Sequence, residues 1–104
     1  MDLSSISDKQ ICQLLMAGDD DAFLEYVKRY GEYAGLIILR LTGKLISEKE
    51  RAAAAWKALY IVQDTLANHM HPQEITDDTL RSKTAETAQK IALVIWRRKQ
   101  MELR

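Results

Sequence analysis

Apolar residues recur every three or four positions along most of this chain, which is the spacing of one face of an α-helix. The clearest series consists of Phe23, Tyr26, Val27, Tyr30, Ala34, Ile37, Ile38 and Leu41. A second series consists of Trp56, Leu59, Val62, Leu66 and Met70. Each series predicts a long amphipathic helix whose apolar stripe lies in the core of a helical bundle.

Capping residues indicate where these helices begin. Ser7 followed by Gln10 has the form of a capping box, and so does Ser47 followed by Glu50. The acidic triplet 19–21 lies just before the first apolar series, where carboxylates cap a helix and favour its positive end. The sequence therefore predicts helices that start near residues 8, 20 and 48.

The ends of the helices are also marked. Gly18 and Gly43 are expected to end the first two helices, and Pro72 the third, because proline disfavours helical geometry in the residue before it. A last helix is expected to begin between residues 76 and 79, with a core stripe of Leu80, Thr84, Ala88, Ile91 and Ile95. We predict an all-α, single four-helix domain over residues 1–104, with residues 1–6 disordered.

Small residues interrupt two of the predicted helices. Gly31 and Gly35 fall inside the first apolar series, where glycine either kinks a helix or allows a close approach by a neighbour. Residues 52–55 are four consecutive alanines, which are most simply explained by a tight helix–helix contact.

The composition favours a soluble cytoplasmic protein. One proline and four glycines leave little room for the turns of an all-β fold. The single cysteine, Cys12, cannot form an intramolecular disulfide, which fits a reducing compartment. The polar, acidic N-terminus does not resemble a signal or transit peptide. No apolar run approaches the roughly 18 residues that a membrane helix needs, so no membrane partner is expected.

Charge is balanced overall but unevenly distributed. The formal net charge is zero, whereas residues 1–24 carry five acidic residues and one basic residue, and residues 81–104 carry seven basic and two acidic residues. A basic end can face phosphate groups. It can equally complement the dipole of a helix C-terminus. Both interpretations stay open at this point.

Motifs for catalysis or metal binding are missing from the sequence. It has no CxxC pair, no HExxH, no glycine-rich phosphate loop and no G-x-S-x-G elbow. His69 and His71 are two residues apart, a spacing that does not direct both toward one metal from a regular helix. We predict no catalytic residue, no metal and no cofactor, and we do not expect an enzyme.

Several short segments resemble a known family in their content and order. Gly-Asp at 18–19, Ala-Phe at 22–23 and Arg-Tyr at 29–30 are followed by Arg-Leu-Thr-Gly at 40–43. IVQDTL at 61–66 and KIALVIWRRKQMEL at 90–103 complete the series. Together they resemble region 2 of the extracytoplasmic-function sigma factors, the domain that binds RNA polymerase and the −10 promoter element. The resemblance spans nearly the whole chain and implies that fold.

The resemblance also implies sites and partners. Polymerase binding would fall to Tyr60, Gln63 and Asp64. Promoter DNA would be bound by His71, Gln73, Lys90, Trp96, Arg97, Arg98 and Lys99. Core RNA polymerase and promoter DNA are the implied partners, and an anti-sigma protein or a protein that carries a −35 domain is a further candidate.

Two alternatives remain beside this hypothesis. A sigma-derived protein-interaction module without DNA binding would agree better with the zero net charge. An unrelated helical adaptor would make the resemblance a coincidence of helical composition.

Overall fold

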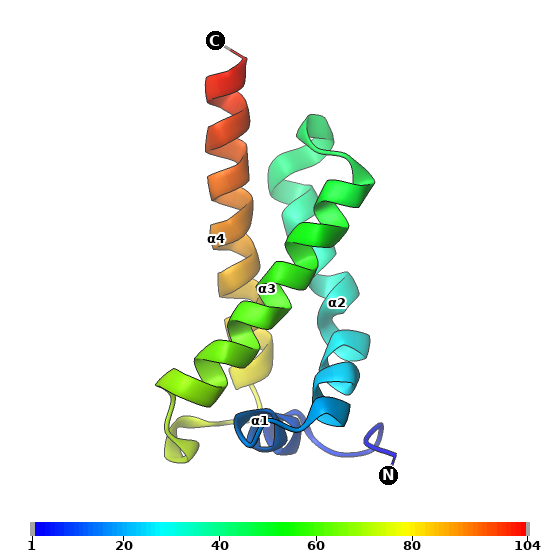
Figure 1. Ribbon diagram of the computed structural model, residues 1–104, viewed down its shortest axis with the longest axis vertical. Helices are drawn as coiled ribbons and strands as arrows, with labels where there is room; N and C mark the ends of the chain where they lie inside the picture. The colour runs from blue at the N-terminus through cyan, green and yellow to red at the C-terminus, as the bar shows by residue number, and fades with distance from the viewer. Residues whose placement is uncertain (1, 104) are drawn as a thin grey trace.

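The computed structural model describes residues 2–103, and within them it has four α-helices, two short 3-10 helices and no strand (Figure 1). In chain order the elements are α1 (Asp8–Met16), α2 (Asp20–Thr42), η1 (Gly43–Leu45), α3 (Glu48–His69), η2 (Pro72–Glu74) and α4 (Thr79–Glu102). The prediction of an all-α four-helix fold is confirmed. No helix within this part of the chain is both long and apolar enough to cross a membrane.

Both predicted capping boxes are present. The Ser7 hydroxyl accepts a hydrogen bond from the Gln10 N–H at 3.1 Å, and the Gln10 side chain accepts one from the Ser7 N–H at 2.9 Å. Ser47 and Glu50 make the same reciprocal pair before α3, at 3.1 Å each. These bonds satisfy amides that have no partner inside a helix, so the starts of α1 and α3 are fixed locally.

The first two helices end as the glycines predict. α1 stops at Met16 and α2 at Thr42, and the glycines that follow, Gly18 and Gly43, have φ angles of 80° and 56°. Side chains disfavour this left-handed region, whereas glycine enters it freely. The sharp reversal after each helix lets the next one fold back against it.

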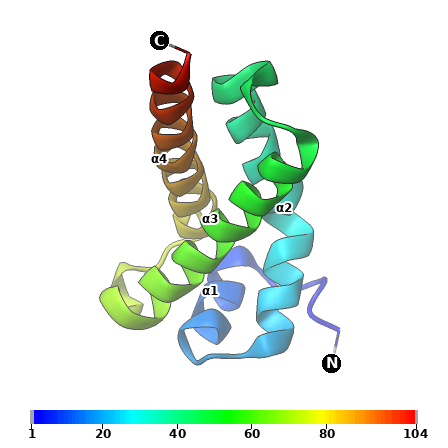
Figure 2. The ribbon, with the colours of Figure 1, turned by 45° about the horizontal axis from the view of Figure 1, so that its top comes forward.

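The three long helices lie side by side, and α1 crosses the end of the bundle where α2 and α4 begin (Figures 1 and 2). The core runs along their shared interior. Its largest buried side chains are Tyr26, Ile11, Leu15, Ile38, Leu59, Leu66, Leu80 and Val62. α2 is one unbroken helix, so its two internal glycines do not kink it into separate pieces.

Two residues expected in the core lie at the surface. Trp56 is 44% exposed, and Leu41 is also exposed. In the first half of α3 the buried positions belong instead to Ala54, Ala55 and Ala58. These small side chains allow neighbouring helices to pack closely, and Trp56 is left at the edge of the contact. The predicted stripe of α4 is buried as far as Ala88, and its Ile91 and Ile95 are half-buried against the core.

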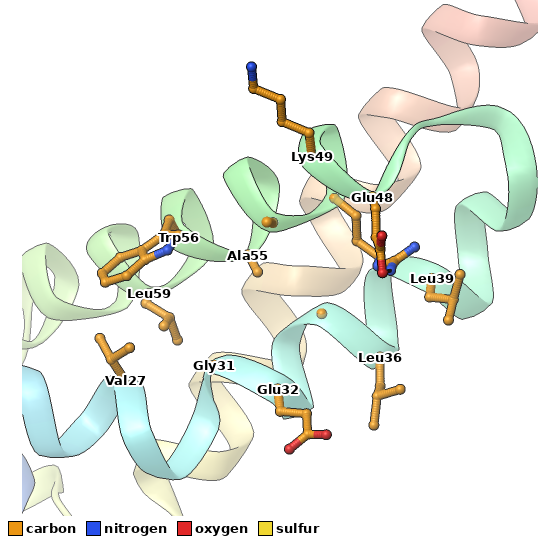
Figure 3. Close-up of a pocket in the computed structure, with 13 residues that line it drawn as sticks. Val27, Gly31, Glu32, Leu36, Leu39, Glu48, Lys49, Ala55, Trp56 and Leu59 are labelled. Carbon is orange, nitrogen blue, oxygen red and sulfur yellow. Dashed lines mark ion pairs between the residues drawn. The ribbon is translucent and has the colours of Figure 1, made fainter.

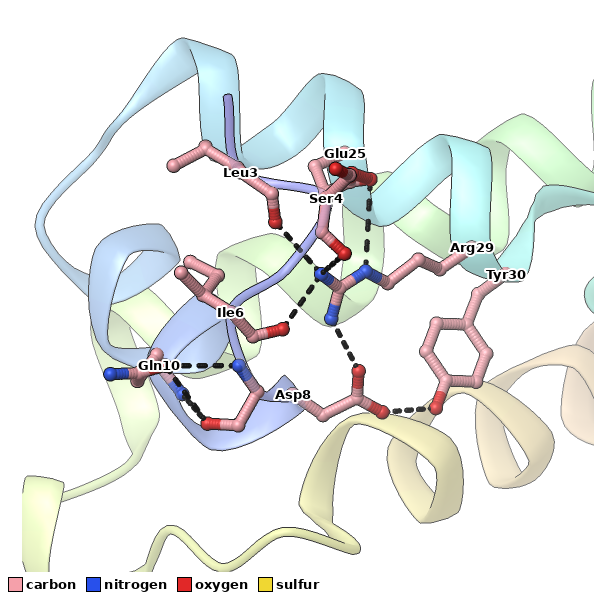
Figure 4. Close-up of polar contacts among 9 residues, drawn as sticks. Leu3, Ser4, Ile6, Asp8, Gln10, Glu25, Arg29 and Tyr30 are labelled. Atoms are coloured by element: carbon pink, nitrogen blue, oxygen red, sulfur yellow. Dashed lines mark hydrogen bonds and ion pairs between the residues drawn. The ribbon is translucent and has the colours of Figure 1, made fainter. Parts of the chain in front are cut away.

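The N-terminal segment differs from the expectation of disorder. The Arg29 guanidinium donates hydrogen bonds to the carbonyl oxygens of Leu3 at 2.9 Å and Ile6 at 2.8 Å, and to the Asp8 carboxylate at 2.9 Å (Figure 4). Leu3 is buried in the core. Arg29 therefore fastens residues 2–6 to α2, while Met1 lies outside the described residues.

Candidate functional site

An exposed aromatic pair marks the outer face of α3. The Tyr60 side chain is 56% exposed, and its ring stacks on that of Phe23 with the centroids 5.0 Å apart. The Trp56 ring lies 5.9 Å from Tyr60 and 6.3 Å from Phe23. Because Phe23 is buried, it holds two exposed rings in defined positions. This is a rigid apolar platform that a partner can contact.

The other two residues proposed to bind polymerase lie beside Tyr60. Gln63 is half-buried and Asp64 is exposed, and the Asp64 carboxylate accepts a hydrogen bond from the Asn68 amide at 2.8 Å. Tyr60, Gln63 and Asp64 share a shallow hollow of about 300 Å³. The structure thus brings the three predicted residues together. With Trp56, which the sequence interpretation left in the core, we call them the α3 surface.

Trp56 could have been recognised as a site residue from one signal. It lies four positions before Tyr60, a spacing that places both rings on one helical face. Together they line a second hollow of about 560 Å³, whose other residues are Ala53, Lys57, Ile61 and Asp64.

The predicted DNA-binding cations on α4 differ in their surroundings. Lys90 pairs with Glu86 at 3.1 Å, and Lys99 approaches Glu50 at 3.9 Å. Within residues 2–103, neither Arg97 nor Arg98 makes an ion pair. Two of the four cations are therefore partly neutralised within the chain, and two arginines remain available to a ligand.

The pKa values of two carboxyl groups next to the α4 lysines, those of Glu86 and Glu50, are lowered, which favours their charged forms. The pKa of Glu86 lies below its ordinary value because Lys90 donates a hydrogen bond to it and Lys83 lies nearby. The pKa of Glu50 is lowered chiefly by the hydrogen bond from the Ser47 amide. Both carboxylates are thus negative at neutral pH.

Trp96 directly precedes Arg97 near the C-terminal end of α4, and it is 41% exposed. The other two DNA-binding candidates, His71 and Gln73, lie in the connection around η2 at the opposite end of α4 (Figure 1). A helix rises about 1.5 Å per residue, so Trp96 lies about 26 Å along α4 from Thr79. The structure does not gather the predicted DNA-binding residues into one cluster.

Cys12 is the one thiol of the chain, and it is a buried residue of α1. Burial and the nearby Asp8 charge raise its pKa to about 11, so it is protonated at neutral pH and a weak nucleophile. Within residues 2–103, no three histidine, cysteine or acidic side chains come close enough together to share a metal ion.

Comparison of the chain with protein-family models, with curated proteins and with solved structures found no match. The resemblance to sigma factor region 2 therefore stays a prediction that rests on the short sequence segments.

Proposed function

We propose that this chain is a sigma-factor-like transcription initiation domain, which binds core RNA polymerase through the α3 surface and promoter −10 DNA through the distal end of α4. The observation that carries the proposal is the exposed Trp56–Tyr60 pair held on buried Phe23. The pair lies directly before the IVQDTL segment at 61–66, and Tyr60 is one of the residues to which the resemblance assigns polymerase binding.

The physical chemistry of the α3 surface suits a protein partner. Tryptophan and tyrosine dominate the binding energy of many protein interfaces, where they are surrounded by a polar rim. Here Gln63 and Asp64 form such a rim next to Tyr60. Stacking on Phe23 restrains the tyrosine before binding, so less side-chain entropy is lost when the partner arrives.

The distal end of α4 suits a nucleic acid. Arg97 and Arg98 can bind phosphate groups, which position a protein without reading sequence, and Trp96 offers a ring on which a base can stack. His71 and Gln73 lie at the other end of the helix, so a DNA strand that met all of these residues would follow the length of α4.

A second candidate function is a protein-interaction module without DNA binding. The ion pairs of Lys90 with Glu86 and of Lys99 with Glu50 favour it, because they reduce the positive charge that α4 presents. The two candidates share the α3 surface and differ at α4.

Titration of the labelled full chain with core RNA polymerase tests whether the α3 surface binds the polymerase. We expect Tyr60→Ala and the double variant Gln63→Ala/Asp64→Ala to weaken binding at least tenfold. The matched control Gln89→Ala/Asp77→Ala changes the same residue types at other exposed positions and should bind like the wild type. Equal affinity of all variants, or no binding by the wild type, would refute the polymerase contact.

Promoter binding is tested with Arg97→Glu/Arg98→Glu, both with core polymerase and without it. Losing two phosphate contacts should reduce the slope of log affinity against log salt by about 2. Lys9→Glu/Lys28→Glu makes the same change in net charge near α1 and should leave the slope unchanged. Promoter affinity that is the same for both double variants would favour the module without DNA binding.

A further inference from the structure

A groove runs along the seam between α2 and α3 (Figure 3). It encloses about 650 Å³, within the range of specific binding sites. Leu36 and Leu39 form its α2 wall, and Trp56 and Leu59 form its α3 wall. Leu36 is 53% exposed, and Leu39 and Trp56 are also exposed. Leu36, Leu39 and Trp56 thus face water in the free protein, and burying them would be favourable, whereas Leu59 is already buried.

The floor of the groove is made of small residues. Gly31 and Gly35 from α2 and Ala52 and Ala55 from α3 all line the groove. Because none of the four has a long side chain, another backbone can approach the floor closely. From Val27 to Leu39 the α2 side spans about 18 Å, which matches roughly three turns of a second helix.

Gly35 is not required by the fold of the free chain. Its φ lies outside the left-handed region, and a Cβ atom added to it would meet no atom within 4 Å. Glycine inside a helix destabilises it by about 1 kcal/mol relative to alanine. The free domain thus bears a cost at Gly35 with no compensating contact, and the consequence of the glycine is that the groove stays open.

The two walls carry opposite charges at the mouth. Glu32 projects from α2 and Lys49 from α3, on opposite sides of the groove in Figure 3. On the α3 wall Arg51 is already paired with Glu48 at 3.6 Å. Within residues 2–103, Glu32 and Lys49 make no ion pair. An occupant therefore meets one free negative edge and one free positive edge.

We propose that this groove binds one amphipathic α-helix of a partner protein, about three turns long, whose apolar stripe fills the groove. Its basic edge faces Glu32 and its acidic edge faces Lys49. Docking an amphipathic helix in an apolar groove is a general mode of recognition. The proposal requires neither polymerase nor DNA binding, although Trp56 belongs both to the groove and to the α3 surface.

The test uses a synthetic helix as the probe. A helix-stapled peptide of about 14 residues carries leucines at i, i+3, i+4 and i+7, lysines on one edge and glutamates on the other. Its binding to the isotope-labelled full chain is followed by NMR at the amides of Gly31, Gly35, Ala52 and Ala55. We expect at least tenfold tighter binding than for a scrambled peptide of the same composition.

A Cβ atom at position 35 meets no neighbouring element within 4 Å, so Gly35→Leu places its side chain in the groove. It should weaken peptide binding at least tenfold while the thermal midpoint stays equal or rises. Gly35→Ala is the matched control and should keep most of the affinity. Full affinity in Gly35→Leu, or equal binding of the scrambled peptide, would overturn the proposal. Groove amides that shift with protein concentration alone would also overturn it, in favour of a second copy.

The charges are tested separately. Glu32→Lys makes both walls positive, so it should weaken the Lys/Glu-edged peptide and strengthen a peptide with glutamates on both edges. If the two peptides keep the same order of affinity in Glu32→Lys as in the wild type, the assignment of the basic and acidic edges is wrong.

Discussion

The hydroxyl groups of Tyr26 and Thr84 lie 2.6 Å apart in the buried contact between α2 and α4. The Thr84 hydroxyl also donates to the Leu80 carbonyl at 2.6 Å. Because threonine has a single O–H, Tyr26 must be the donor to Thr84. Burial raises the pKa of Tyr26, which keeps it in the donating form. The order of donors runs from Tyr26 through Thr84 to the backbone of α4.

This order of donors predicts that substituting Thr84 lowers the free energy of unfolding more than substituting Tyr26. Thr84→Val leaves the buried Tyr26 hydroxyl without a partner and should lower the free energy of unfolding by about 2 kcal/mol, whereas Tyr26→Phe leaves Thr84 bonded to Leu80 and should cost about 1 kcal/mol. The double variant should lose less than the sum. Urea denaturation of all four proteins measures these values, and strictly additive losses would show that the two hydroxyls are not coupled.

Alkaline pH should destabilise the domain through Cys12. Its folded pKa is raised from 9.0 to about 11, so the unfolded chain releases this proton first. The contribution of the Cys12 proton to the free energy of unfolding is fully present below pH 9. It is lost as pH rises toward 11, with a slope of up to about 1.4 kcal/mol per pH unit. Tyr26 and Tyr30, whose pKa values are also raised, add to the loss at higher pH.

The contribution of the thiol can be isolated. Denaturation of the wild type and of Cys12→Ala at a series of pH values between 7 and 11 gives the two slopes. We expect the variant to lose stability less steeply between pH 9 and 11, whatever its stability at pH 7. Parallel curves would mean that Cys12 does not titrate differently in the folded and unfolded chains.

Arg29→Lys should release the N-terminal segment. One ammonium group cannot reproduce the fork that reaches the Leu3 and Ile6 carbonyls and Asp8 together. We expect faster hydrogen exchange at residues 3–6 and a loss of about 2 kcal/mol in the free energy of unfolding. Lys28→Arg is a nearby control that should change neither quantity, and unchanged exchange in Arg29→Lys would show that Leu3 alone holds the segment.

Substitutions in the aromatic cluster should distinguish the ring that stabilises the fold from the ring that is available for binding. Phe23→Ala removes a buried ring and should cost about 3 to 4 kcal/mol, whereas Tyr60→Ala removes an exposed ring and should cost about 1 kcal/mol or less. Thermal denaturation distinguishes the two. A large loss of stability in Tyr60→Ala would mean that this ring serves the core, and would weaken the case for a binding surface.

The helix boundaries could be predicted because their causes are local. Ser7 and Gln10 cap each other within one turn, and Gly43 needs no distant neighbour to take its φ. Trp56 could not be placed correctly because a spacing of three and four defines a face without saying where its centre lies. The buried Ala55 and Ala58 show that the centre of the α3 face lies to one side of the tryptophan.

The candidate sites were predictable only in part. Tyr60, Gln63 and Asp64 share one hollow because they occupy two successive turns. The role of Arg29 was not predictable, because two of its partners are backbone carbonyls more than 20 residues away. The groove at Gly35 needs α2 and α3 together, and sequence alone offered only an unusual glycine inside a helix.

The last third of α4 has a dynamic consequence. Ala92 is its last fully buried residue among those described, Ile95 is half-buried against the core, and the helix continues beyond it to Glu102. The segment continues a formed helix, but few core contacts hold it in place, and helix ends of this kind open at low free energy. Its amides should therefore exchange with solvent through local opening, well before the rest of the bundle unfolds. A ligand of Arg97 and Arg98 would thus meet a segment that adapts its shape, and part of its binding free energy would be spent on ordering that segment.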